Sequence, residues 1–210
     1  MRENKRIDGR QRLVDATLDC LAEYGYQGSS VRRIASTAGV ALNLVRHHFG
    51  NKAGLMSESY RHFRRSAMTA YMSEAKDAGT DPVKRLEAFA ATLLVGQAAA
   101  RRRIMKIWIS YLPLLVADRN IAAVHAETYE FFLQELADCL TRIYAQRGET
   151  PSPDDIRRLA IAIYSAIDGI WLECALNPSR MTPDEALKIA LDLIGPRIGI
   201  SFGNCADNMT

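Results

Sequence analysis

Hydrophobic residues recur at the three- and four-residue spacing of helices along almost the whole chain, and no stretch shows the strict alternation of a β-strand. Glycines and helix-capping residues interrupt this pattern and divide it into segments. The segments predict helices over residues 9–25, 29–38, 41–49, 51–79, 81–94, 101–116, 119–147, 152–176 and 182–198. We therefore expect an all-α protein of about nine helices.

Several helix starts carry local signals. Asp81, Ser152 and Thr182 each precede a proline, and an N-cap residue followed by a first-turn proline is a typical helix start. Glu185, three residues after Thr182, completes the pattern of a capping box. Pro113 lies inside the apolar pattern of one segment, where we expect it to bend or end the helix.

The segment 29–55 predicts two short amphipathic helices joined at a glycine. Gly39 can adopt the left-handed conformation that ends a helix, and the hydrophobic pattern resumes after it. The apolar positions are Val31, Ile34, Ala35 and Ala38 before the break and Leu42, Val45 and Phe49 after it. This arrangement is typical of a helix-turn-helix, in which the second helix lies in the major groove of DNA and the first crosses the phosphate backbone.

Basic charge is concentrated beside this motif. Residues 1–54 hold nine Lys or Arg against five Asp or Glu, whereas the remainder holds eighteen against nineteen, within a formal net charge of +3. Charge alone usually marks a solvated surface. Next to a helix-turn-helix, however, a basic surplus is the electrostatic footprint of phosphate binding, so we expect double-stranded DNA as a partner.

Five residues around the second helix are candidates for reading bases: Ala41, Leu42, Asn43, Arg46 and His47. We expect all five to lie on the reading helix itself. Asn43 can pair with adenine, and Arg46 can reach guanine or phosphate. Ala41 or Leu42 can touch a thymine methyl group.

Four further residues lie at helix starts, where free backbone N–H groups and the helix dipole favour a phosphate. They are Ser30, Arg32 and Arg33 in the first helix of the motif and Lys52 at the start of the next helix. These contacts should position the protein on DNA rather than specify a sequence. For Arg32 and Arg33, simple exposure to solvent is the alternative.

The composition predicts a compact protein without a membrane segment. Hydrophobic residues make up 48% of the chain, which is ample for a core, and no apolar run approaches the roughly 20 residues that span a bilayer. The first residues, MRENKRIDGRQR, are too charged for a signal peptide, so we expect a cytoplasmic protein. The adjacent His47 and His48 lack a third ligand, and the cysteines show no metal-binding spacing, so we expect no metal and no cofactor. In a reducing compartment the cysteines are more typical of a core than of bridges; they are Cys20, Cys139, Cys174 and Cys205.

The stretch GVALNLVRHHFGNKAGL at 39–55 resembles the segment typical of TetR-family repressors, in which a Gly-Val turn leads into the reading helix. The family's spacing is matched by the pair His48-Phe49 and then by Lys52 and Leu55. Two positions depart from the family pattern. The family often has Ser or Thr where this chain has Ala41, and Tyr where it has Arg46, so the resemblance implies a guanidinium at a phosphate that a tyrosine hydroxyl usually contacts.

The resemblance implies a three-helix DNA-binding domain over 1–54 and a larger helical domain for ligand binding and dimerisation over 55–210. The helix at 152–176 suits the second domain because it is apolar on two faces. One face holds Ile156, Leu159, Ile163, Ile167, Ile170 and Cys174, and the other holds Ala160, Tyr164, Trp171 and Ala175. Such a helix is either central in its own domain or shared with a second subunit. The family favours a homodimer joined through the last two helices, whose two-fold symmetry would make the operator an inverted repeat.

Two later stretches, KIWISY at 106–111 and AIDGIWLECAL at 166–176, are similar to the choline-sensing BetI branch of the family, which represses glycine-betaine synthesis genes. Trp108 and Tyr111 share one helical face, and Tyr164, Asp168 and Trp171 share another. Aromatic faces with a carboxylate can hold a quaternary ammonium such as choline through cation–π attraction. An aromatic stripe is more often core, however, and Asp168 can equally cap a helix or pair with an arginine.

Other function classes lack their motifs. The chain contains no GxSxG, no Walker loop and no HExxH, so we expect no enzyme. A ligand-responsive repressor is the function that the resemblance implies. The alternatives on the same fold are a multidrug-type repressor of an efflux gene, with looser ligand choice, and a transcriptional activator.

Overall fold

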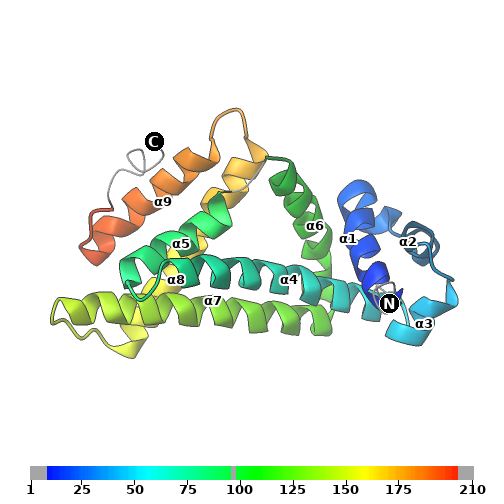
Figure 1. Cartoon of the computed structure of the whole chain (residues 1–210), viewed down its shortest axis with the longest axis horizontal. Coiled ribbons are helices and arrows are strands. Elements are labelled where there is room, and N and C mark those ends of the chain that lie inside the picture. Colours follow the sequence, from blue (N-terminus) through cyan, green and yellow to red (C-terminus); the bar gives the residue numbers. More distant parts are fainter. Residues whose placement is uncertain (1–8, 96–97, 203–210) are drawn as a thin grey trace, which may run out of the picture. The chain divides into compact units, whose positions relative to one another are not determined.

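The computed structural model describes residues 9–95 and 98–202. Within these residues the regular structure consists of nine helices, which confirms the all-α prediction (Figure 1). In chain order they are α1 (Gly9–Gly28), α2 (Val31–Ala38), α3 (Asn43–Phe49), α4 (Lys52–Asp77), α5 (Pro82–Leu94), α6 (Ala98–Ala117), α7 (Arg119–Gln146), α8 (Pro153–Leu176) and α9 (Pro183–Ile198).

The helix starts predicted from Asp81, Ser152 and Thr182 are confirmed, and each has the side-chain cap that its sequence indicated. Asp81 and Ser152 accept backbone N–H groups from the first turns of α5 and α8. In the capping box of α9, the Glu185 N–H donates to Thr182 Oγ1 at 3.2 Å, and the Thr182 N–H donates to Glu185 Oε2 at 2.8 Å. These bonds satisfy N–H groups that a helix leaves without partners at its start.

Two helices run further than their sequence pattern predicts. The helical geometry of α1 breaks at Gly25, where φ is 64° and ψ is −177°, but the element continues to Gly28. α6 does not end at Pro113 and extends to Ala117. A proline inside a helix removes one backbone donor, and the leucines that follow it pack against the core and hold the last turn.

The described chain packs as two compact units. The first comprises Met1–Ser66 with Ala99–Thr128, and the second comprises Ala67–Ala98 with Tyr129–Thr210, as far as the described residues extend. In the first unit α6 shares a core with the helix-turn-helix, and its fully buried members include Leu13, Ile34, Tyr60 and Tyr111. This division by packing differs from the functional boundary at residue 54, which stays a prediction.

The second unit has an aromatic core. The ring centroids of Phe89 and Phe132 are 5.7 Å apart, and those of Phe132 and Tyr164 are 6.1 Å apart. These separations are typical of favourable ring pairs. Cys20, Cys139 and Cys174 are buried thiols, whereas Cys205 lies outside the described residues.

One described helix, α8, is long and apolar enough to cross a membrane by length and composition alone, and α6 with α7 pass the same test as a bent pair. This differs from the expectation of no membrane-length segment, because α8 is apolar on average although polar residues interrupt it. In its most apolar stretch 28% of the residues are buried, and the exposed residues include Leu172 and Leu176. Exposed leucines on a long apolar helix are also typical of one that packs against a second subunit.

Candidate functional site

α2 is capped at both ends, and its C-terminal cap begins the turn into α3. Ser30 caps the start of α2, where its Oγ accepts the Arg33 N–H at 3.2 Å. At the other end Gly39 has φ 61°, a conformation that side chains rarely adopt, and its N–H donates to the Ser36 carbonyl at 3.0 Å. The Gly39 cap therefore sets where the chain leaves α2 and turns toward α3.

The outer face of α3 is polar. Asn43, Arg46 and His47 lie at positions i, i+3 and i+4, and all three are exposed. On the opposite face Val45 is 2% exposed and anchors α3 in the core of the first unit. The helix therefore presents these three predicted base-reading side chains together.

The structure places Ala41 and Leu42 in the turn before α3, so the prediction that they lie on the helix is wrong. The first hydrogen bonds run from Leu44 N–H to Ala41 O and from Val45 N–H to Leu42 O, at 3.0 and 3.2 Å. Each spans three residues rather than four, so the chain enters α3 through a tighter turn. Both residues are exposed, and their contact with DNA stays a prediction.

The predicted phosphate-binding residues lie in the first unit at two helix starts. Ser30, Arg32 and Arg33 are exposed at the start of α2, and Lys52 is the first residue of α4. A cation in the first turn of a helix adds to the positive end of the helix dipole. An incoming phosphate would relieve that unfavourable arrangement.

The turn from α3 into α4 is tight. Asn51 caps α4, since its Oδ1 accepts the Gly54 N–H at 2.9 Å. A side chain at position 54 would clash with the Phe49 carbonyl oxygen, so this close approach requires glycine. The turn holds Lys52 next to the end of α3.

Two of the cations lie over tyrosine rings. The Arg33 guanidinium carbon is 4.2 Å from the Tyr24 ring centroid, and its Nη1 donates to the Gly28 carbonyl at 2.6 Å. The Lys52 Nζ is 4.3 Å from the Tyr26 ring centroid, and burial lowers the pKa of this lysine. Neither tyrosine was predicted as part of the site, although a glycine between two aromatic residues just before the motif was an available signal.

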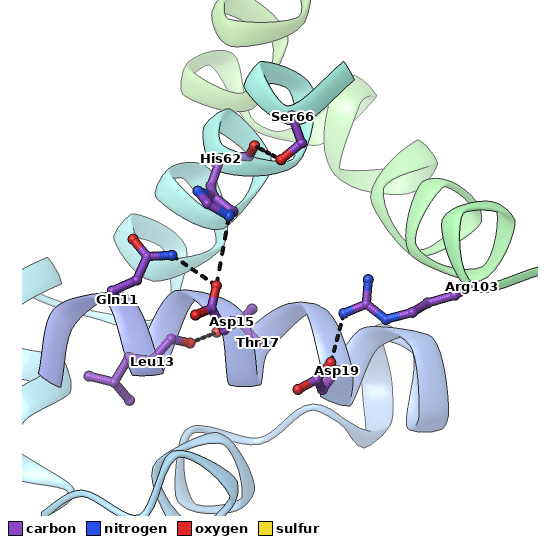
Figure 2. Close-up of polar contacts among 8 residues, drawn as sticks. All are labelled: Gln11, Leu13, Asp15, Thr17, Asp19, His62, Ser66 and Arg103. Atoms are coloured by element: carbon purple, nitrogen blue, oxygen red, sulfur yellow. Dashed lines mark hydrogen bonds and ion pairs between the residues drawn. The ribbon is translucent and has the colours of Figure 1, made fainter. Parts of the chain in front are cut away.

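Polar contacts join α1 to α4 and α6 within the first unit, as Figure 2 shows. Arg103 Nη2 of α6 lies 2.7 Å from Asp19 Oδ1, and His62 Nε2 of α4 lies 3.7 Å from Asp15 Oδ1. The Arg103 and Asp19 side chains are 46% and 56% exposed, so the pair adds little stability. It does link α6 directly to the helix that supports the helix-turn-helix.

A partly buried polar cluster lies between α4, α6 and α7 in the first unit. The Tyr60 hydroxyl is 2.9 Å from His125 Nδ1, and the Trp108 and His125 ring centroids are 5.6 Å apart. Burial, and after it the charge of Arg64, lower the pKa of His125. Tyr111 is fully buried beside Tyr60 and donates to a backbone carbonyl of α4 at 3.1 Å. Trp108 and Tyr111 were predicted effector residues, whereas the other three were not, because they share no motif.

The remaining predicted effector residues lie on α8 in the second unit. Tyr164 is 4% exposed, and its ring centroid is 5.0 Å from that of Tyr129. Trp171 is partly buried against the same core, and Asp168 is exposed. The five predicted effector residues are thus divided between the two units.

Two pockets of the second unit, of about 330 and 290 Å³, lie along α7 beside α8 and α5. Neither is lined by a predicted effector residue. Among the described residues no three His, Cys, Asp or Glu side chains gather as a metal site requires.

Comparisons with known proteins cover most of the chain. Residues 13–58 match the family model for bacterial regulatory proteins of the tetR family, and residues 82–197 match the model for the C-terminal part of BetI-type transcriptional repressors. The chain is 26% identical over 197 residues to the HTH-type transcriptional regulator BetI of Vibrio atlanticus, which covers 93% of this chain and 94% of that protein. It is 29% identical over 189 residues to BetI of Burkholderia ambifaria, covering 88% and 91% of the two chains. Its fold is similar to that of a transcriptional regulator from Pseudomonas aeruginosa PAO1, with a TM-score of 0.81, 27% identity and 90% of each chain covered.

Proposed function

Because the chain belongs to the TetR family of bacterial transcriptional regulators and has a C-terminal part of the BetI repressor type, we propose that it binds an inverted-repeat operator as a homodimer and releases it when a small effector binds. Regulators of this family bind DNA and small ligands and act as dimers. The exposed polar face of α3, held on a capped turn, is the observation that carries the proposal. The target is DNA, so we expect the protein in the cytoplasm.

Base reading is assigned to the exposed residues at the start of α3 and along it. Asn43 would pair with adenine, and Arg46 would bind guanine or a phosphate next to it. His47 lies beside Arg46 on the same face. Ala41 and Leu42, exposed in the preceding turn, would contact a thymine methyl group.

Phosphate binding is assigned to the two helix starts on either side of α3. Ser30, Arg32 and Arg33 would contact the backbone from α2, and Lys52 would do so from α4. Such contacts fix the register of the protein on the duplex and carry no sequence information. They should therefore act alike on specific and non-specific DNA.

The dimer interface is assigned to α8 and α9. Exposed positions on both helices recur at alternating three- and four-residue intervals, which is the pattern of a helix–helix seam. They are Ala162, Ser165, Gly169, Leu172 and Leu176 on α8 and Ile189, Leu193 and Pro196 on α9. Small residues on α8 would allow close approach of a second helix, and burial of the leucines would stabilise the pair.

The proposed effector is choline or a related quaternary ammonium. Tyr164, Asp168 and Trp171 lie at positions i, i+4 and i+7 of α8, and Tyr164 belongs to an aromatic cluster. A desolvated cation over an aromatic ring gains about 2 kcal/mol, and a carboxylate adds charge attraction. Trp108 and Tyr111 of the first unit remain in the proposed set of effector residues.

Release requires that the effector prefers one of two conformations. If the effector binds more tightly to a state in which the two α3 helices have the wrong separation, it weakens binding of the operator. The affinity for the operator falls by the same factor by which bound operator weakens effector binding. A coupling of roughly 1 to 3 kcal/mol would weaken DNA binding about 5- to 150-fold.

Selection of binding sites from a random pool of DNA duplexes, followed by effector titration, tests the proposal. We expect a two-fold symmetric sequence whose half-sites lie about one helical turn or a multiple apart, and release by choline or betaine aldehyde. An asymmetric site would refute the dimeric mode. Indifference to both compounds and to a panel of hydrophobic cations would refute the effector assignment alone, whereas broad release by the panel would indicate a multidrug-type repressor. Stimulated transcription in vitro would indicate an activator.

A further inference from the structure

Two tyrosines at the end of α1 each contact a different helix start. Tyr24 lies under Arg33 in the first turn of α2, and Tyr26 lies under Lys52, the first residue of α4. The break in helical geometry at Gly25 separates the two tyrosines. A glycine is needed there because residues with a side chain rarely adopt a φ of 64°. Gly25 therefore allows the change of chain direction between the two tyrosines.

The Tyr26 ring is held by the protein interior. It is partly buried and packs against the core of the first unit. The Lys52 Nζ lies 4.3 Å from its centroid, well inside the roughly 6 Å range of a cation–π contact. A fixed ring thus holds the end of a side chain that is otherwise among the most flexible in proteins.

Arg33 and Lys52 differ in their partners from Arg10 and Arg61, two other basic residues of the first unit. Arg10 and Arg61 both pair with Glu58, at 2.7 and 2.8 Å. Neither Arg33 nor Lys52 forms an ion pair with a carboxylate of the described residues. A ring orients a cation and leaves its charge in place, whereas a carboxylate would compete with a phosphate.

We propose that Tyr26 is a positioning residue for DNA binding, which holds the Lys52 ammonium where it meets a DNA phosphate, and that Tyr24 does the same for Arg33. This inference rests on the proposed function, in which both cations contact the DNA backbone. A side chain that is already ordered loses less conformational entropy on binding, so its contact with phosphate contributes more to the affinity. Because the contact is with phosphate, the gain is the same for every DNA sequence.

The expected effect is modest and measurable. Loss of one partly exposed cation–π contact should weaken binding about two- to fivefold for each subunit, and hence about four- to twenty-five-fold for a dimer. Removal of the Lys52 charge should in addition make the negative slope of log affinity against log salt less steep, by about one for each subunit.

The test measures binding of the full chain to a mixed-sequence duplex about three helical turns long, over a series of salt concentrations. The variants are Tyr26→Phe, Tyr26→Leu, Lys52→Gln and the double variant Tyr26→Leu/Lys52→Gln. We expect Tyr26→Phe to bind like the wild type and Tyr26→Leu to bind more weakly. In the Lys52→Gln background, Tyr26→Leu should have no further effect, since the group that it positions is gone.

The matched control is Tyr144→Leu, which removes a ring 5.4 Å from Arg147 in the second unit and should leave DNA binding unchanged. Thermal unfolding of each variant shows whether it folds. If Tyr26→Leu does not fold, the same cycle with Tyr24→Leu and Arg33→Gln replaces it.

Three results would overturn the inference while leaving the repressor proposal intact. They are additive losses in the double variant, equal weakening by Tyr26→Phe and Tyr26→Leu, and wild-type affinity of Lys52→Gln. Failure of the wild-type protein to bind any duplex at low salt would instead overturn the proposed function, and the inference with it.

Discussion

Replacing Leu172 and Leu193 together by alanine should separate the two subunits without unfolding either one. The two side chains are 42% and 52% exposed in the single chain, and neither belongs to the core cluster of the second unit, so about half of each is left for a surface that covers it. Both lie on the seams proposed for the dimer, one on α8 and one on α9. The perturbation therefore acts on association while leaving the core cluster of each subunit intact.

The magnitude follows from the exposed fractions. Full burial of a leucine side chain is worth about 1.5–3 kcal/mol, and roughly half of each of these leucines remains to be buried, which gives about 1 kcal/mol apiece. Two-fold symmetry places four such side chains in the interface. After allowing for the methyl group that alanine keeps, the double substitution should cost about 3 kcal/mol and raise the dimer dissociation constant roughly 100-fold.

Sedimentation over a series of protein concentrations gives the dissociation constant, and circular dichroism checks that the helices persist. Met72→Ala is the control, because Met72 is 59% exposed on α4, outside the proposed seams. The operator affinity of the double variant should fall together with dimerisation. A dimer dissociation constant of the double variant within about threefold of the wild type would show that the α8–α9 face is not the interface. An equal increase of that constant by Met72→Ala would show the same.

Three further changes separate DNA reading, stability and effector binding. Arg46→Ala should abolish operator binding, with unchanged circular dichroism, because it removes a base or phosphate contact from α3; gel-shift affinities near wild type would take Arg46 out of the interface. Burial and Arg64 hold the pKa of His125 below its usual value, so in the acidic range the unfolded chain binds a proton that the folded chain excludes. Stability should therefore fall as pH drops below about 6.5, and His125→Gln should flatten that part of the urea-unfolding profile; identical profiles for both proteins would contradict this. Asp168→Asn should raise the choline concentration for half-release about tenfold without changing operator affinity, and an unchanged titration curve would remove Asp168 from the effector site.

Local interactions explain which parts of the fold could be predicted from the sequence. The starts of α5, α8 and α9 depend on capping residues within three positions, so Asp81, Ser152 and Thr182 indicate them directly. The start of α3 was misplaced because the apolar pattern runs through Leu42 and conceals a tight turn. The continuation of α6 past Pro113 depends on core packing, which the local sequence does not contain.

The candidate DNA-binding face could be predicted because its residues are neighbours in one motif. The contact between Tyr60 and His125 could not, since the two residues are 65 positions apart and meet only because α4 packs against α7. The same holds for Tyr26 and Lys52, whose meeting depends on the path of the chain through α2 and α3. Periodicity predicts that an aromatic residue is buried, but the side chain that it meets is decided by tertiary packing.

Paired recognition of DNA by two copies of α3 is tested most directly by counting subunits on one duplex. The selected operator is compared with a duplex in which one half-site is scrambled, by sedimentation of the complexes and by affinity at fixed salt. Two subunits, or a multiple of two, should bind the intact operator, with at least about a 100-fold loss of affinity on the scrambled duplex. A single subunit bound with equal affinity to both duplexes would contradict symmetric recognition.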